Sequence, residues 1–289
     1  MKKSDRNAYL IFPVLILAGF LFALAVSKGG PLIMGIPFFV FLVGIAFLIQ
    51  WLVFIPAYLL QSEKFFDLTG SITYIIIASI AIFCSDNVDT RSILLWFLIL
   101  IWAFRLGGFL FKRVQKSGKD DRFDDLKTSF IRFLNVWTIQ GLWVSITMSA
   151  ALVAMTTSHR KEMGLYAIVG ILLWVIGFVI EVIADYQKSR FNKNPANKGE
   201  FIQTGLWSRS RHPNYFGEIM LWIGIAIISL PVFKGLQWIA KISPGFVILL
   251  LTRVSGIPLL EKKADKKWGG QKEYEDYKKR TPVLIPKFK

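Results

Sequence analysis

The sequence has few of the residues that form disulfides or bind metals. It contains one cysteine, Cys84, and two histidines, His159 and His212. A single cysteine excludes an intramolecular disulfide, and the apolar run around Cys84 predicts a small buried side chain there. The sequence also lacks an HExxH motif and a cysteine cluster, so we expect no metal site.

The usual motifs of soluble nucleotide-binding domains are also missing. No P-loop occurs, and no GxGxxG motif follows a strand, so we expect no Rossmann site. Acidic residues are scarce, with 19 Asp and Glu against 35 Lys and Arg, and the formal net charge is +16. Membrane topology accounts for such an excess, because Lys and Arg collect in cytoplasmic loops. We therefore expect no nucleic-acid partner.

Long apolar stretches are what the chain has in abundance. Hydrophobic residues make up 54% of its 289 residues, and aromatic residues make up 15%. Stretches of about 18–22 residues are almost free of charge, and each could cross a bilayer core of roughly 30 Å as a helix. They predict an all-α, polytopic transmembrane helical bundle of about 8 spans (7–9). The expected spans are 8–26, 35–58, 70–84, 92–111, 135–156, 163–183, 214–232 and 236–252.

The distribution of basic residues predicts how the chain crosses the membrane. With the N-terminus inside, most Lys and Arg residues fall in the inner segments, which predicts that both termini are cytoplasmic. The rich polar segments 112–127, 185–214 and 253–289 then share that face, where we expect the active site. We interpret residues 1–60 as N-terminal transmembrane helices, the first span not being a cleaved signal, and residues 61–289 as the catalytic domain.

The most informative segment is "SRSRHPNYFGEIM", residues 208–220. Pro213 suits the first position of a helix, because no backbone N–H bond is lost there. Arg211 and His212 precede it, at a helix end where free N–H groups favour an anion. Tyr215 belongs to the same turn as Arg211. Taken alone, these residues would also suit a basic anchor at the membrane edge.

An asparagine and a glutamate argue against a simple anchor. Asn214 and Glu218 are four residues apart and therefore share one face of the predicted helix. Glu218 lies about one turn inside the span, where a carboxylate needs a partner or a polar cavity. A membrane anchor has no use for a buried acceptor. We therefore expect a binding site here.

Two other spans carry charged residues. Arg105 lies within the fourth span, before the close-packing pair Gly107 and Gly108; it could also reach the interface by snorkelling. Glu181 and Asp185 are four residues apart at the end of the sixth span, where they could accept hydroxyl or amide groups. We expect the polar edges of the fourth, sixth and seventh helices to face one water-accessible chamber.

Two polar segments have plainer interpretations. The run "GKDDRF" (118–123), with Asp121 and Arg122, is typical of a solvated loop. The run "EYEDYKKRTPVLIP" (273–286) predicts an amphipathic segment on the membrane surface, with Tyr274 and Tyr277 as interface aromatics.

Taken together, these segments resemble a known family. "GLWSRSRHPNYFGE" resembles the motif of the steroid 5α-reductase superfamily, in its bacterial membrane branch with a steroid-reductase-like C-terminal domain. "FDLTGS", "WAFRLGGFLFKR", "DDRF", "DYQK" and "YEDYKKRTPVLIP" stand in the expected order. The similarity covers residues from about 60 to 289.

The resemblance implies an integral membrane reductase that uses NADPH to transfer a hydride to a C=C bond of a lipid-like, enone or sterol-like substrate. The substrate would arrive from the bilayer of the bacterial inner (plasma) membrane. By resemblance, Asn214 would hold the nicotinamide amide near Glu218. The remaining implied cofactor-binding residues are Arg211, His212, Tyr215, Asp185, Glu181, Arg105, Arg122, Asp121, Arg253 and Tyr277.

The substrate half departs from the family pattern. The position of the tyrosine that polarises the substrate carbonyl falls at or near Trp102, and its acid partner falls near Asp67, or otherwise Glu63. These three are the candidate catalytic residues. The family's C-terminal histidine is replaced by a segment that contains Arg253 and Glu261.

Two alternative functions fit the same sequence. Isoprenylcysteine and phospholipid methyltransferases share an Arg-x-Pro-x-Tyr-x-Gly pattern, which Arg211, Pro213, Tyr215 and Gly217 match, and they bind S-adenosylmethionine. Their tandem Glu-Glu is reduced here to the single Glu261. The other alternative is a non-catalytic lipid-binding protein. Neither the substrate nor the oligomeric state follows from the amino-acid sequence.

Overall fold

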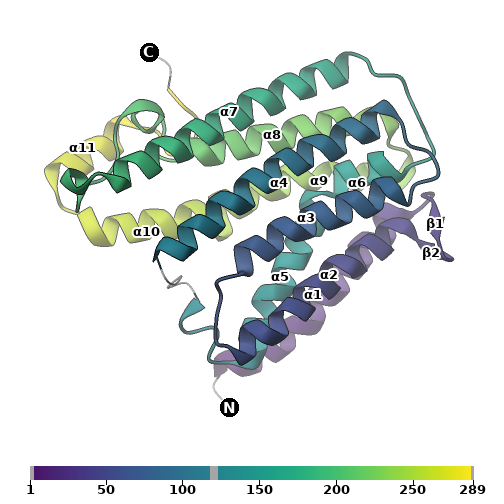
Figure 1. Ribbon diagram of the computed structural model, residues 1–289, viewed down its shortest axis with the longest axis horizontal. Coiled ribbons are helices and arrows are strands. Elements are labelled where there is room, and N and C mark those ends of the chain that lie inside the picture. Colours follow the sequence, from purple (N-terminus) through teal and green to yellow (C-terminus); the bar gives the residue numbers. More distant parts are fainter. Residues whose placement is uncertain (1–2, 118–122, 288–289) are drawn as a thin grey trace. The chain divides into compact units, whose positions relative to one another are not determined.

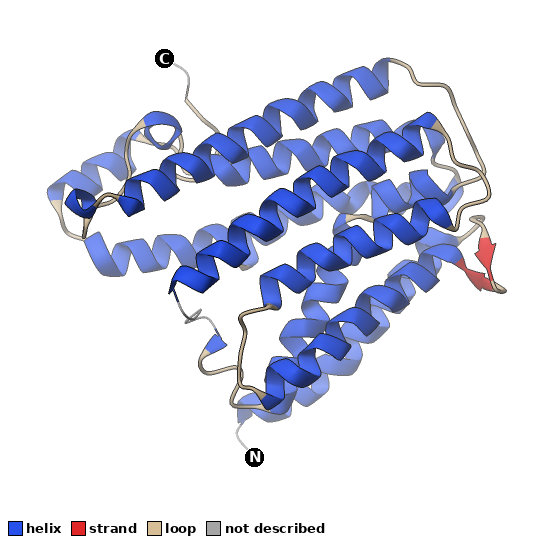
Figure 2. Cartoon of the chain, viewed as in Figure 1, coloured by secondary structure: helices blue, strands red, loops and turns tan. Residues whose placement is uncertain are grey.

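The structure is a computed structural model that describes residues 3–117 and 123–287. The described residues are almost entirely helical, with one small hairpin, β1 (Leu32–Ile33) and β2 (Ile36–Pro37) (Figures 1 and 2). The α-helices are α1 (Lys3–Ser27), α2 (Phe38–Leu59), α3 (Phe66–Phe83), α4 (Thr90–Ser117), α5 (Phe130–Thr147), α6 (Ser149–Thr156), α7 (Leu165–Lys193), α8 (Pro213–Ser229), α9 (Ile242–Leu249), α10 (Gly256–Trp268) and α11 (Lys272–Arg280).

Most of these helices are long and apolar enough to cross a membrane. Among the described residues 7 helical segments meet that condition, or up to 8 if the bent pair α5 and α6 forms one span. The predicted all-α polytopic membrane bundle is therefore confirmed. The final segment is longer than expected, because helical structure continues from Gly235 to Trp268.

The expected fifth span, 135–156, is not one straight helix. α5 and α6 meet at an angle of 55° at Met148. Serine hydroxyls bind carbonyl groups of α5 beside this break: Ser149 Oγ donates to the carbonyl of Ile146 at 2.8 Å, and Ser243 Oγ donates to that of Thr147. Side chains that insert into the carbonyl ladder are a recognised cause of sharp helix bends.

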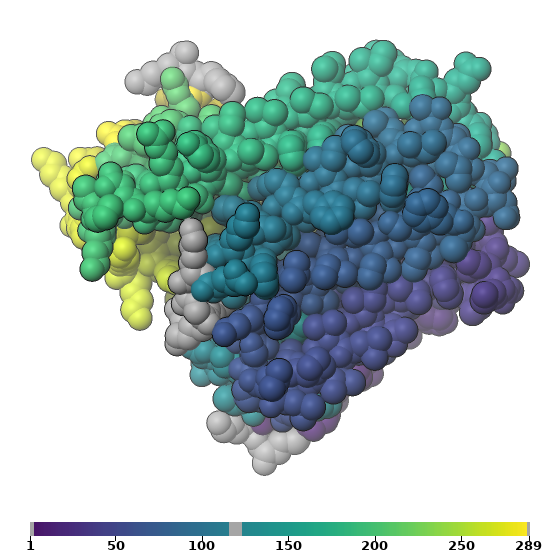
Figure 3. Space-filling model, in the orientation of Figure 1, coloured from purple at the N-terminus to yellow at the C-terminus, as the bar shows by residue number. Residues whose placement is uncertain are grey.

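The chain forms two compact units. Unit 1 comprises Met1–Met163 and Ser229–Ser243, and unit 2 comprises Gly164–Ile228 and Pro244–Lys289. In unit 1, α5 packs against α1 and α2, and α3 packs against α4. Side chains of α3 and α4 form a closed surface on the face shown (Figure 3). The division into residues 1–60 and 61–289 remains a prediction.

Unit 2 is built on a close approach of α7 and α8. A Cβ atom at Gly177 would lie 2.6 Å from the carbonyl oxygen of Gly217, and one at Gly170 would lie 2.6 Å from that of Gly224. Only hydrogen at these four positions allows the two backbones to meet, as in small-residue packing between transmembrane helices. These glycines therefore fix the spacing of α7 and α8.

The prediction for Cys84 is wrong. Its side chain is exposed rather than buried. Cys84 is the C-terminal cap of α3, and it lies one residue past the last helical position, Phe83. The apolar run of the sequence continues up to Cys84, but the buried part of α3 ends at Ile82.

Candidate functional site

The "SRSRHPN" segment is held by the C-terminal residues of the chain. The backbone N–H of Arg211 donates to the carbonyl of Pro282 at 2.9 Å, and that of Lys287 donates to the carbonyl of Arg209 at 3.0 Å. Ser210, fully buried, donates its hydroxyl to the carbonyl of Leu284 at 2.7 Å. α8 then begins at Pro213, as predicted. The C-terminal residues thus fix the start of α8.

A carboxylate from α10 binds both basic residues of this segment. Glu261 Oε1 lies 2.7 Å from Nε2 of His212, and its other oxygen accepts a hydrogen bond from Nη1 of Arg211. His212 is only 4% exposed, and its ring stacks on that of Tyr215 at 5.8 Å between centroids. Glu261 therefore positions a guanidinium and an imidazole at the mouth of α8.

Burial sets the protonation of this imidazole. Loss of hydration lowers the pKa of His212, because the charged imidazolium is disfavoured away from water. The hydrogen bond and the charge of Glu261 act in the opposite direction but do not overcome burial. His212 is therefore neutral at pH 7. Within the described part of the chain, its Nδ1 atom is buried and has no hydrogen-bond partner.

Asn214, two residues after His212, has another buried polar atom without a hydrogen-bond partner in the described part of the chain. Its Oδ1 atom is buried and forms no hydrogen bond with any described residue. Glu218 follows four residues later on α8 and is half-buried. A buried amide oxygen without a partner costs about 1–3 kcal/mol, so a ligand donor would relieve that cost. The pattern fits an amide-bearing ligand.

The acids of α7 lie in the same layer as the start of α8. Glu181 is 2% exposed, and a Cβ atom placed on Gly217 would lie 3.1 Å from its Cβ atom. Asp185, one turn further along α7, is 7% exposed. Glu181 thus lies against the first turns of α8, and the predicted cofactor-binding roles of Glu181 and Asp185 remain predictions.

The tyrosines of α11 are not interface aromatics. Tyr274 and Tyr277 are 3% and 5% exposed and pack on Phe201. The hydroxyl of Tyr277 donates to the carbonyl of Trp207 at 2.7 Å, and burial raises its pKa, so it remains a neutral donor. The amphipathic face of α11 therefore covers protein rather than lipid. A cofactor-binding role of Tyr277 stays a prediction.

The candidate catalytic acids belong to unit 1, where each has a cationic neighbour. Asp67 Oδ2 lies 3.4 Å from Nη2 of Arg113, and Glu63, which is 4% exposed, lies 3.0 Å from Nζ of Lys127. Each candidate acid therefore already has a cationic partner within unit 1.

The other unit 1 candidates lie on α4. Trp102 is 3% exposed, and its ring meets Tyr74 edge to face at 5.1 Å. Arg105 is half-buried one turn later. Because Arg105 belongs to unit 1 and the α7 and α8 residues belong to unit 2, their convergence on one chamber remains a prediction.

Three candidates remain: Arg253, Asp121 and Arg122. Arg253 is exposed on the π-helix η6 (Leu250–Val254) of unit 2. Asp121 and Arg122 lie outside the described residues.

Sequence reasoning did not select Glu261 as a site residue. A signal was available, because Glu261 replaces the tandem glutamate of the methyltransferases and lies near the expected position of the reductase histidine. The contact between Glu261 and Arg211 could not be predicted from the sequence, because the two residues are 50 positions apart.

The fold and these residues define a class: a multi-pass, all-α membrane protein with a buried polar cluster at the start of one span. Comparison with known proteins narrows it further. The family model described as "Protein of unknown function (DUF1295)" matches residues 53–281. The chain belongs to this family and, as its resemblance indicated, to the steroid-reductase-like superfamily.

Its curated relatives are distant. The chain is 30% identical over 117 residues to a steroid 5-alpha-reductase of Gossypium hirsutum, covering 40% of each chain. It is 30% identical over 159 residues to a delta(14)-sterol reductase of Mus musculus, covering 50% of this chain and 35% of the relative. A protein named probable O-methyltransferase ustE, from Ustilaginoidea virens, is 34% identical over 72 residues, or 25% of each chain. The chain thus spans less than half the length of these relatives, and no solved structure matches it.

Proposed function

We propose that this protein is a membrane-bound, NADPH-dependent reductase that saturates a C=C bond of a lipid-like substrate. The observation that carries the proposal is the buried, unpartnered Oδ1 of Asn214 at the start of α8. This atom suits the carboxamide of a nicotinamide, which offers N–H donors. Similarity to steroid and sterol reductases supports the same function.

The residues of unit 2 would bind and orient the cofactor. Asn214 Oδ1 would accept a carboxamide hydrogen, and Glu181 and Asp185 would accept hydroxyl or amide hydrogens. Glu261 orients Arg211, whose positive charge favours an anionic ligand at the mouth of α8. When bound, NADPH supplies the hydride.

Saturating the double bond also takes one proton on the neighbouring carbon. The resemblance assigns substrate polarisation to Asp67, Glu63 and Trp102, and places Arg105 and Arg253 at the cofactor phosphates. The same proposal places the protein in the bacterial inner membrane, with both termini and the active site on the cytoplasmic side. The substrate would enter from the bilayer. The orientation rests on the excess of basic residues in the inner segments.

Cofactor titration tests the proposal directly. The purified full-length protein should bind NADPH, and Asn214→Ala should weaken that binding by about 10-fold, the value of one hydrogen bond. Asn192→Ala is the matched control, because Asn192 is exposed on the same unit and should leave binding unchanged. Equal affinity of the Asn214→Ala and wild-type proteins would remove the nicotinamide assignment.

A methyltransferase is the second candidate, and one observation favours it: the 72-residue similarity to the probable O-methyltransferase. The Arg211–Glu261 pair would then hold the charged groups of S-adenosylmethionine. The titration therefore includes NADH and S-adenosylmethionine. Tight binding of S-adenosylmethionine without NADPH would overturn the reductase proposal, and binding of neither would favour the non-catalytic lipid-binding alternative.

A further inference from the structure

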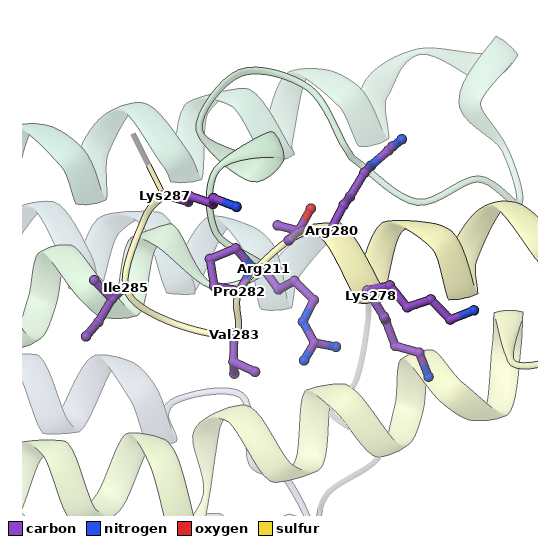
Figure 4. Close-up of a pocket in the computed structure, with 9 residues that line it drawn as sticks. Arg211, Lys278, Arg280, Pro282, Val283, Ile285 and Lys287 are labelled. Carbon is purple, nitrogen blue, oxygen red and sulfur yellow. The ribbon is translucent and has the colours of Figure 1, made fainter. Parts of the chain in front are cut away.

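An open hollow of about 510 Å³ lies beside Arg211, between α11 and the C-terminal residues 281–287 (Figure 4). The cofactor proposal uses one residue of this hollow, Arg211, and none of its other lining residues. Its basic side chains are Arg211, Lys278, Lys279, Arg280 and Lys287. Within unit 2 it is thus a concentration of positive charge contributed by two segments of the sequence.

The acids nearby do not neutralise this charge. Lys278 pairs with Asp265 at 2.9 Å and with Glu275 at 3.3 Å, and Arg211 pairs with Glu261. Within the described residues Lys279, Arg280 and Lys287 form no ion pair, and the guanidinium of Arg280 donates a hydrogen bond to Oε1 of Gln203. Lys279 and Lys287 are therefore available to an external anion.

The same hollow also has an apolar side. Pro282, Val283 and Ile285 line it together with the basic residues, and Val283 and Ile285 are 38% and 70% exposed. A site for a free, fully hydrated anion would gain nothing from exposed aliphatic side chains. Basic and apolar side chains combined are typical of contacts with the headgroup and upper acyl chain of an anionic lipid.

The hollow lies at the end of a membrane-crossing helix. Arg211 comes two residues before Pro213, where the candidate span Pro213–Val232 begins. Headgroups occupy the layers that flank the hydrocarbon core, so this end of the span is at headgroup depth. The C-terminal segment that lines the hollow is held in place, because residues 282–287 are hydrogen-bonded to residues 209–211.

A buried hydroxyl beside the hollow has unused hydrogen-bonding capacity. Thr281 lines the hollow and is 2% exposed, and its Oγ1 atom forms no hydrogen bond within the described residues. Buried hydroxyls are normally satisfied. This observation is independent of the charge count, and a phosphate oxygen is an acceptor of the kind that a hydroxyl can use.

We propose that this hollow binds the phosphate of an anionic membrane phospholipid. Lys279 and Lys287 supply positive charge that attracts the phosphate, and Val283 and Ile285 offer aliphatic surface to the first carbons of the acyl chains. The ligand is a phosphate ester with one net negative charge or more, held at the surface of the bilayer. This site stands independently of the proposed reductase activity.

Native mass spectrometry of the detergent-purified, full-length protein tests the proposal. The probe is dioctanoyl phosphatidylglycerol, and the comparison ligands are dioctanoyl phosphatidylcholine, glycerophosphoglycerol, inorganic phosphate and NADPH. The variants are Lys279→Gln/Lys287→Gln and Ile285→Ser. The matched control is Lys266→Gln/Lys272→Gln, two exposed lysines of the same unit that do not line the hollow.

Phosphatidylglycerol should bind more tightly than phosphatidylcholine, glycerophosphoglycerol and inorganic phosphate, and NADPH should not displace it. The double lysine variant should lose about 25-fold in affinity, at about 5-fold per lysine near an anionic lipid. Ile285→Ser should weaken phosphatidylglycerol but not glycerophosphoglycerol, which has no acyl chains. The control should behave as the wild type.

Three results would overturn the proposal. Equal loss in the control variant would mean that binding reflects general charge. Equal affinity for inorganic phosphate would make the site one for free phosphate. Displacement of phosphatidylglycerol by NADPH in equal amounts would make the hollow part of a nucleotide site. Because no readout depends on turnover or on NADPH binding at Asn214, failure of the reductase proposal would leave this test unaffected.

Discussion

His212 and Glu261 lie 49 positions apart in the sequence, yet Nε2 of the imidazole is 2.7 Å from the carboxylate oxygen Oε1. The same carboxylate accepts a hydrogen bond from Arg211. This contact joins α10 to the residues that begin α8. The protonation of one buried histidine therefore depends on an acid that sequence motifs alone would treat as peripheral.

Replacing the acid should change the titration of the histidine. Glu261→Gln removes a negative charge and a strong acceptor, both of which raise the pKa of His212. The pKa of His212 should therefore fall below its wild-type value. Nitrogen NMR of ¹⁵N-histidine-labelled protein can measure this, because the chain has only two histidines and His159→Gln assigns the signals. An unchanged or higher pKa would contradict the contact.

The same histidine should make stability depend on pH. Burial lowers the pKa of His212 below 6.5, so between that pH and the folded-state pKa the unfolded chain binds more protons than the folded chain. The free energy of unfolding should fall as the pH is lowered from 7 through this window, and the contribution should level off below it. Thermal unfolding at a series of pH values measures the effect. A His212→Gln variant that keeps the full wild-type slope would contradict this assignment.

The approach of α7 and α8 should not tolerate a methyl group. Gly177→Ala would place a Cβ atom 2.6 Å from the carbonyl oxygen of Gly217, and we expect a loss of about 1–3 kcal/mol in stability. Gly245→Ala is the matched control, because Gly245 lies in α9 and a Cβ atom added there would meet no atom within 4 Å. The control should be neutral or stabilising by about 0.5–1 kcal/mol. Denaturation in mixed micelles compares the two, and equal stabilities would argue against the close packing.

The ion pair Glu63–Lys127 gives a prediction for unit 1. Lys127→Met removes the ammonium group that lies 3.0 Å from the carboxylate of Glu63, which is 4% exposed. We expect a loss of about 1.5–3 kcal/mol, the range for a hydrogen bond to a charged group. The double variant Glu63→Leu/Lys127→Met should recover most of that loss, because replacing both ions by apolar groups is often neutral. A double variant less stable than Lys127→Met would contradict this.

The amino-acid sequence by itself determined the class of fold. Runs of apolar residues long enough to span a bilayer predict helices, because in lipid each backbone polar group must be satisfied within its own segment. Pro213 marked the start of α8 for an equally local reason, namely its missing N–H. The motif residues of the superfamily are also contiguous in the sequence, so the resemblance is visible in the order of the residues alone.

Only the tertiary structure decided which side chains meet. Glu261 reaches Arg211 and His212 because α10 returns to the start of α8, and no sequence spacing encodes that return. Tyr274 and Tyr277 are buried on Phe201 rather than in the interface, although amphipathic periodicity is the same for a helix that covers lipid or protein. Local patterns fix helices and their ends, whereas long-range packing fixes partners, burial and therefore the chemistry of the site.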